Sequence, residues 1–144
     1  RITTLFLDAG IDPDARNAQD ETPLMLSARR GHNHLTALLV ERGAVLDLTD
    51  ARGSTAVMEA AVAGHDETLE VLLRRGANAN LTNDDGQSAL LLAAKNGRAG
   101  AIKLLVNAGA QINARDEQGR TALDWAKFND HEEAGELLRA AGAK

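Results

Sequence analysis

The chain has 144 residues, of which 44% are apolar and 26% are charged, a composition typical of folded proteins and unlike that of disordered or membrane-spanning chains. The 21 acidic and 16 basic side chains give a net charge of −5, which provides no positive field for nucleic acid or an anionic membrane. The chain contains no cysteine and 2% aromatic residues, which excludes disulfides, thiolate metal sites and a stacking platform for bases.

The first segment reads as half of a structural unit. Ile2, Leu5, Phe6 and Leu7 have the spacing of a second helix whose first helix is missing, so residues 1–16 are expected to be a partial N-terminal repeat. We therefore expect the chain to be a fragment of a longer solenoid or fusion.

The next segment has the signals of a short helix from Pro23 to about Arg30. Thr22 can cap its start, and proline at the first helical position lacks only an N–H that would have no partner there. Gly31 supplies a left-handed residue at its end.

A second helix follows in the same unit. Leu35, Leu38 and Leu39 recur at helical spacing before Gly43, and Asn33, or Asp66 in the next unit, is expected to cap such a helix. Helices of this length are shorter than the roughly 12 to 15 residues that are stable alone in water, so neighbouring units must stack.

These elements recur every 33 residues, with polar, turn-forming stretches between the units. The period is carried by columns such as Gly43, Gly76, Gly109 and Gly142, and Thr22, Thr55, Ser88 and Thr121. It predicts one array over 1–144, with repeats at 17–49, 50–82 and 83–115 and a C-terminal capping repeat at 116–144.

The repeated segments resemble ankyrin repeats. The resemblance lies in Glu21-Thr22-Pro23-Leu24, Gly53-Ser54-Thr55-Ala56, Gly86-Gln87-Ser88-Ala89-Leu90 and Gly119-Arg120-Thr121-Ala122-Leu123, together with the residues that follow them. It implies an all-α solenoid of stacked antiparallel helix pairs, with β-turn fingers and a concave groove that bind other proteins. It also implies that the repeats neither catalyse a reaction nor hold a cofactor.

Several residues depart from the repeated pattern. Asp20 and Asp130 stand at glycine positions, so their turns are expected to differ in detail. Asp124, Lys127 and Arg139 replace apolar residues in the last repeat, which predicts a solvated end of the array.

The clusters of polar residues in the sequence do not indicate a metal-binding or catalytic site. His32 and His34, and the His-acid-acid runs that begin at His65 and His131, have the residue types of metal ligands. Equivalent positions lie about 10 Å apart in neighbouring repeats, so we expect no shared metal ion. No histidine is in register with Ser54, Thr55 or Ser88, and we expect no enzyme activity.

Candidate binding residues are those that vary between repeats on the expected fingers and groove. They are Gln19, Glu21, Arg29, Arg30, Arg52, Ser54, Glu59, Val62, Asp84, Asp85, Gln87, Lys95, Asn96, Glu117, Gln118, Arg120 and Phe128. Acidic fingers at Asp84, Asp85 and Glu117 alternate with basic groove residues, so a partner with both signs of charge fits.

Two residues in one column call for separate interpretation. Glu59 stands where Leu26, Leu92 and Trp125 stand in the other repeats, so it either reaches solvent at the groove edge, which we favour, or anchors a ligand. Trp125 is expected to pack on the third unit as part of the cap.

The function expected from these features is a rigid, monomeric scaffold that binds another protein. The alternative is a regulatory or targeting arm that binds a domain of its own parent chain, as in a secreted bacterial effector or an enzyme with a repeat segment. The cytoplasm is slightly favoured as the compartment.

Overall fold

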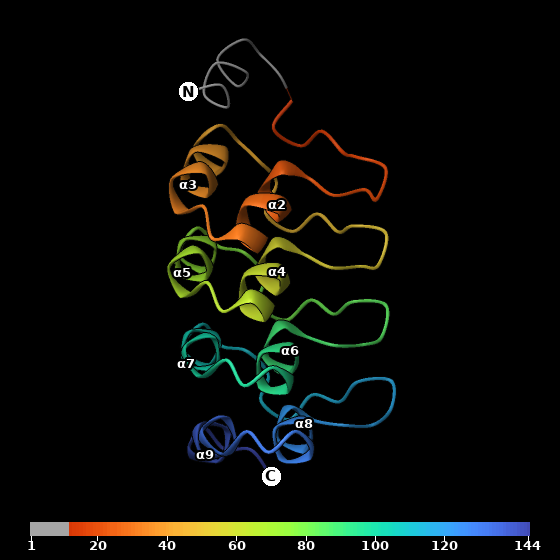
Figure 1. Ribbon diagram of the computed structural model, residues 1–144, viewed down its shortest axis with the longest axis vertical. Coiled ribbons are helices and arrows are strands. Elements are labelled where there is room, and N and C mark those ends of the chain that lie inside the picture. Colours follow the sequence, from red (N-terminus) through yellow and green to blue (C-terminus); the bar gives the residue numbers. More distant parts are fainter. Residues whose placement is uncertain (1–11) are drawn as a thin grey trace.

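The computed structural model describes residues 12–144, which fold into four helix pairs stacked in a column (Figure 1). The helices are α2 (Pro23–Arg30), α3 (Asn33–Glu41), α4 (Ala56–Ala63), α5 (Asp66–Arg74), α6 (Ala89–Lys95), α7 (Ala99–Asn107), α8 (Ala122–Phe128) and α9 (Glu132–Ala140). Within these residues the β-structure is a single bridge between Thr82 and Ser88. Most of the partial repeat expected at 1–16 lies outside the described residues.

The inner helices α2, α4, α6 and α8 begin as the sequence predicts. The hydroxyl oxygens of Thr22 and Thr55 accept hydrogen bonds from the backbone N–H three residues on, both at 3.3 Å, and Ser88 and Thr121 do the same at 3.2 Å. Pro23 is the first residue of α2, and Gly31 ends that helix in the left-handed conformation. Local capping therefore sets where each inner helix begins.

The two aspartates at glycine positions keep the glycine conformation. Asp20 has φ 62° and Asp130 has φ 59°, close to the 78° of Gly53 and the 77° of Gly64 at equivalent positions. Aspartate is one of the few residues that tolerate this region. The backbone of these two turns therefore keeps the left-handed conformation and does not show the difference expected from the sequence.

The expected caps of the second helices are wrong. Asn33 and Asp66 are the first residues of α3 and α5, and the capping positions are held by His32 and His65, which make no side-chain capping bond. His65 instead packs against the preceding repeat: a Cβ placed on Gly31 would come within 2.6 Å of His65 Nδ1.

The core runs along the column between the two rows of helices. Leu39, Leu72, Leu105 and Leu138, one from each repeat, are almost fully buried, and small alanines let the helices approach closely. Inner helices pack on inner helices and outer on outer between neighbouring repeats. Asp124, Lys127 and Arg139 are exposed, which agrees with the polar end that the sequence predicts.

The fingers that project beside the inner helices are built by one recurring residue (Figure 1). In each finger an Asn or Asp Oδ1 accepts the backbone N–H groups two and four residues on, at 2.9–3.0 Å; these residues are Asn17, Asp50, Asn83 and Asp116. Backbone bonds such as Asp84 N–H to Arg52 O, at 3.0 Å, join one finger to the next. The fingers therefore form a continuous, regular wall.

A second ladder joins the repeats at their far ends. At each junction a side-chain oxygen of one repeat accepts a hydrogen bond from a backbone N–H of the next, at 2.8–3.1 Å. The acceptor and donor residues are Asp14 and Val45, Asp47 and Asn78, Asn80 and Gln111, and Asn113 and Lys144.

None of the helices formed by residues 12–144 combines the length and the apolar character needed to cross a membrane.

Candidate protein-binding surface

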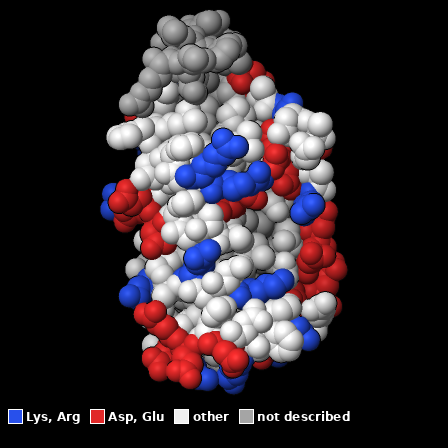
Figure 2. Space-filling view, in the orientation of Figure 1, with Lys and Arg blue, Asp and Glu red and all other residues white. Residues whose placement is uncertain are grey.

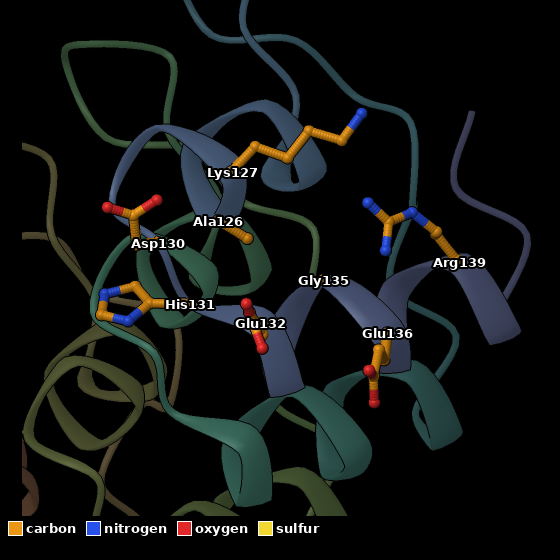
Figure 3. A pocket seen from close by; sticks show the side chains of 8 residues that line it. All are labelled: Ala126, Lys127, Asp130, His131, Glu132, Gly135, Glu136 and Arg139. Atoms are coloured by element: carbon orange, nitrogen blue, oxygen red, sulfur yellow. The ribbon is translucent and has the colours of Figure 1, made fainter.

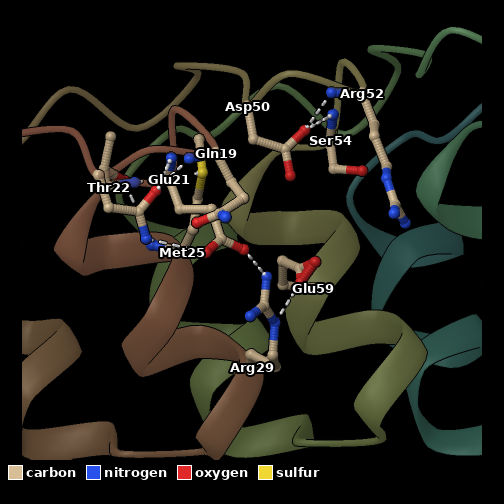
Figure 4. Close-up of polar contacts among 10 residues, drawn as sticks. Gln19, Glu21, Thr22, Met25, Arg29, Asp50, Arg52, Ser54 and Glu59 are labelled. Atoms are coloured by element: carbon tan, nitrogen blue, oxygen red, sulfur yellow. Dashed lines mark hydrogen bonds and ion pairs between the residues drawn. The ribbon is translucent and has the colours of Figure 1, made fainter.

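The groove is the surface between the fingers and the inner helices, and its N-terminal end is occupied by an ion-paired arginine (Figure 4). Arg29, near the end of α2, points toward the fingers. Its guanidinium donates to Glu21 at the base of the first finger, and its Nε lies 3.0 Å from Glu59 Oε2 on α4. Two repeats thus contribute carboxylates to one cation.

This arrangement favours the charged forms of Glu21 and Arg29. A hydrogen bond from Asn17, followed by that from Arg29, lowers the pKa of Glu21 below its ordinary value. The hydrogen bond to Glu59, followed by that to Glu21, raises the pKa of Arg29. The side chain of Glu59 is 18% exposed, so our interpretation that it simply reaches solvent is incomplete: it is paired with Arg29.

A hollow of about 400 Å³ adjoins this ion pair. Asp50, Arg52 and Ser54 of the second finger and Gln19 of the first contribute to its walls. Arg52 shares this hollow with the ion pair, and its positive charge helps to lower the pKa of Glu21. The N-terminal end of the groove is therefore polar and largely neutralised from within.

The C-terminal end of the groove has a different chemistry. Trp125 on α8 is 8% exposed, and Lys95 Nζ lies 4.5 Å and Arg120 Cζ 4.7 Å from the centroid of its ring. Arg120 Cζ also lies 5.1 Å from the ring of Phe128, which stands edge-on to the indole with 5.9 Å between centroids. Phe128 is 68% exposed. Aromatic rings and cations thus share one accessible surface.

Asp116 holds this aromatic group in place. Its Oδ2 accepts the indole N–H of Trp125 at 2.9 Å, while its Oδ1 accepts the backbone N–H groups of Gln118 and Arg120. Burial of Asp116 favours the neutral acid, but these hydrogen bonds, with that from Arg120 first, outweigh burial and lower the pKa of the carboxyl. Asp116 therefore stays ionised and joins the fourth finger to α8.

The candidate residues fall into two rows. Gln19, Glu21, Arg52, Ser54, Asp84, Asp85, Gln87, Glu117, Gln118 and Arg120 lie on the fingers, and Arg29, Arg30, Glu59, Val62, Lys95, Asn96 and Phe128 lie on or at the ends of inner helices. The groove brings together Glu21 with Arg29 and Glu59, and Lys95 with Arg120 and Phe128 through Trp125. Asn96 instead bonds its own helix at Leu92 O.

Sequence reasoning did not identify Asp116 as part of this surface. The signal was present in the sequence, because Asn17, Asp50, Asn83 and Asp116 recur at the 33-residue period. Trp125 was assigned to packing on the third unit, and its contact with Lys95 of that unit agrees with this.

Another hollow, of about 460 Å³, lies at the end of the array (Figure 3). Charged side chains of α8 and α9 surround it, among them Lys127, Glu132, Glu136 and Arg139. Over residues 12–144 no group of three or more His, Asp or Glu side chains is placed to hold a metal ion. The charged side chains around this hollow do not converge on a single point.

The stacked helix pairs define a helical repeat protein with a groove along one side. A family model described as ankyrin repeats (3 copies) matches residues 1–83 and 63–144, and the chain therefore belongs to the ankyrin repeat family. No curated protein matches the sequence. Ankyrin repeats are generally protein–protein interaction modules, and the fold is generally non-catalytic.

Proposed function

We propose that this chain is a non-catalytic adaptor that binds another protein through its groove and finger tips. The observation that supports this most strongly is the C-terminal end of the groove, where an exposed phenylalanine adjoins Arg120 and a tryptophan that also contacts Lys95. Aromatic residues and arginine are the side chains most enriched at the energetic centres of protein interfaces.

The rigidity of the surface supports the same proposal. Backbone hydrogen bonds join neighbouring fingers, and each finger is closed by its own Asn or Asp side chain. A surface that is ordered before binding loses little conformational entropy when a partner docks. The groove therefore suits recognition by a preformed shape.

Site-directed photocrosslinking tests this function. A photoreactive phenylalanine analogue replaces Phe128 in the groove or, as the control, exposed Lys103 on α7. We expect position 128 to give a discrete crosslinked partner in source cells, identified by mass spectrometry, and position 103 to give none. Equal crosslinking from both positions would contradict a groove-centred function.

The same crosslinks distinguish the two forms of this role. Crosslinks to a separate polypeptide indicate a scaffold or adaptor, whereas crosslinks to another part of the same parent chain indicate a regulatory or targeting arm. Phe128 is suited to this comparison because its side chain is largely exposed, so the analogue can be introduced without disturbing the core.

A further inference from the structure

The 33-residue period places the same three positions of the groove side by side in each part of the array. At the N-terminal end they hold Glu21, Arg29 and Glu59, a cation between two carboxylates. Two periods further along the chain they hold Gln87, Lys95 and Trp125, which line one hollow of about 220 Å³. The cation is kept, and both carboxylates are replaced.

A second cation joins Lys95 at this end. Arg120 comes from the fourth finger and lies over the same indole ring. Among residues 12–144 neither Lys95 nor Arg120 has a carboxylate within ion-pair distance. Their charged groups rest on aromatic faces, which are weaker partners than a carboxylate that accepts a hydrogen bond from the cation.

Asp116 attracts Arg120 electrostatically, but it is not within ion-pair distance of either cation. It borders the same hollow, but its two oxygens already accept the indole N–H and the N–H groups of the finger backbone. Asp85 and Glu117 line the hollow from the finger side without pairing with either cation. Within residues 12–144, both positive charges therefore lie over the indole of Trp125 without a carboxylate in direct ion-pair contact.

We propose that the cation–aromatic patch, formed by Lys95, Arg120, Trp125 and Phe128, binds one Asp or Glu side chain of a partner protein. The incoming carboxylate supplies to Lys95 the negative charge that Glu21 and Glu59 supply to Arg29. The exposed ring of Phe128 receives an apolar side chain next to that acid. The inference rests on the proposed function and specifies what the groove recognises.

The fingers restrict the partner to a single acid at this point. Figure 2 shows acidic groups along the finger edge, and also on the opposite side and at the lower end, with basic groups between them over the helices. Because Asp85 and Glu117 face the hollow, a polyacidic segment is repelled on one side while a lone carboxylate on the helix side is attracted. The preceding set of the three positions, Ser54, Val62 and Leu92, carries no charge and adds no second acid site.

Selection from random peptides displayed on phage, with the whole chain as the target, tests this inference. We expect the enriched peptides to share one Asp or Glu beside an apolar residue, and to change the emission of Trp125, the sole tryptophan, when added as synthetic peptides. Replacing the shared acid by its amide should weaken binding about ten- to a hundredfold, the effect of losing a hydrogen bond to a charged group.

Variants of the patch provide the control. Lys95→Gln combined with Arg120→Gln should abolish the preference for acid, and Lys95→Glu with Arg120→Glu should select Lys or Arg instead. Arg120 bonds Asp116 through its backbone, so these changes leave the finger closed, which circular dichroism and the melting temperature verify. Lys103→Gln on α7 removes a positive charge outside the groove and should change nothing.

The outcomes separate this inference from the proposed function. Peptides that bind the groove without a shared acid, and equally well after the double glutamine change, would overturn the acid-recognition inference alone. Peptides insensitive to every groove substitution, or the absence of any enriched peptide, would count against both.

Discussion

The imidazole ring of His131 lies directly against the backbone of Gly97 in the preceding repeat. A Cβ on Gly97 would come within 2.7 Å of His131 Nδ1, and Gly97 has a φ of +68°. On its other side the ring places Nε2 3.1 Å from the carbonyl oxygen of Lys95. Gly97, which lies between the two helices of one pair, is thus also part of the contact with the next pair.

Gly97→Ala should destabilise the protein more than Gly109→Ala. Gly109 has a similar φ of +88°, but nothing lies within 4 Å of its would-be Cβ, so alanine there costs about 1 kcal/mol of backbone strain. At Gly97 the displaced His131 ring adds about 1–3 kcal/mol. Urea unfolding of both variants measures the difference, and equal losses would contradict the contact.

Acid should weaken the C-terminal repeat through Asp116. Its pKa is lowered in the folded chain, so its contribution to the free energy of unfolding is full above about pH 5 and is lost as the pH falls through about 4 toward the folded-state pKa. Urea unfolding at several pH values, followed by Trp125 emission, measures this loss.

Asp116→Asn serves as the matched variant for that titration. The amide cannot accept on both sides as the carboxylate does, so stability near neutral pH should fall by about 1–3 kcal/mol. The difference from the parent should then shrink in acid, where the parent carboxyl is protonated. Glu21, whose pKa is also lowered, should contribute to the pH dependence in the same direction. A difference that stays constant with pH would contradict the role of Asp116.

The pair of Arg29 and Glu59 should contribute little to stability. The Arg29 side chain is 42% exposed, and ion pairs of this kind are worth about 0–1 kcal/mol. A double-mutant cycle with Arg29→Gln and Glu59→Gln should give a coupling in that range that falls in high salt. A coupling well above this range would show that the pair is shielded from solvent.

Truncation of the leucine column should have the largest effect. Leu72→Ala empties a site with no exposed surface and should cost about 2–5 kcal/mol, whereas Val45→Ala at an exposed position should stay within about 0.5 kcal/mol. Thermal and urea unfolding of both variants provide the test. A small loss at Leu72 would mean that neighbouring helices close the cavity.

The features that the sequence predicted are those set by short-range chemistry. Thr22 and Pro23 start a helix and Gly31 ends it through bonds within a few residues of the chain, and the structure confirms all three. The helix starts assigned to Asn33 and Asp66 were wrong because both residues lie inside the first turn. The surroundings of Asn33 and Asp66 are determined by contacts with other repeats and not by the sequence immediately around them.

The candidate site was less predictable for the same reason. Column analysis identified Glu59 as unusual, but its partner Arg29 is 30 residues away and is brought near by stacking. Likewise, the positions of Lys95 and Arg120 hold different residues in the other repeats, which indicates that they lie on the surface. That both lie over the ring of Trp125 depends on the distance between neighbouring repeats. The periodic sequence shows which positions are equivalent in successive repeats, but the contacts between those positions depend on how the repeats stack.

The ladder from Asp14, Asp47, Asn80 and Asn113 to the following repeat gives every junction the same kind of fastening. Since the main helix contacts also join immediate neighbours, tension applied to the two ends of the array is carried in series by these junctions. Under such a load we expect the junctions to open individually, and a partner that spans several fingers to hold neighbouring junctions together.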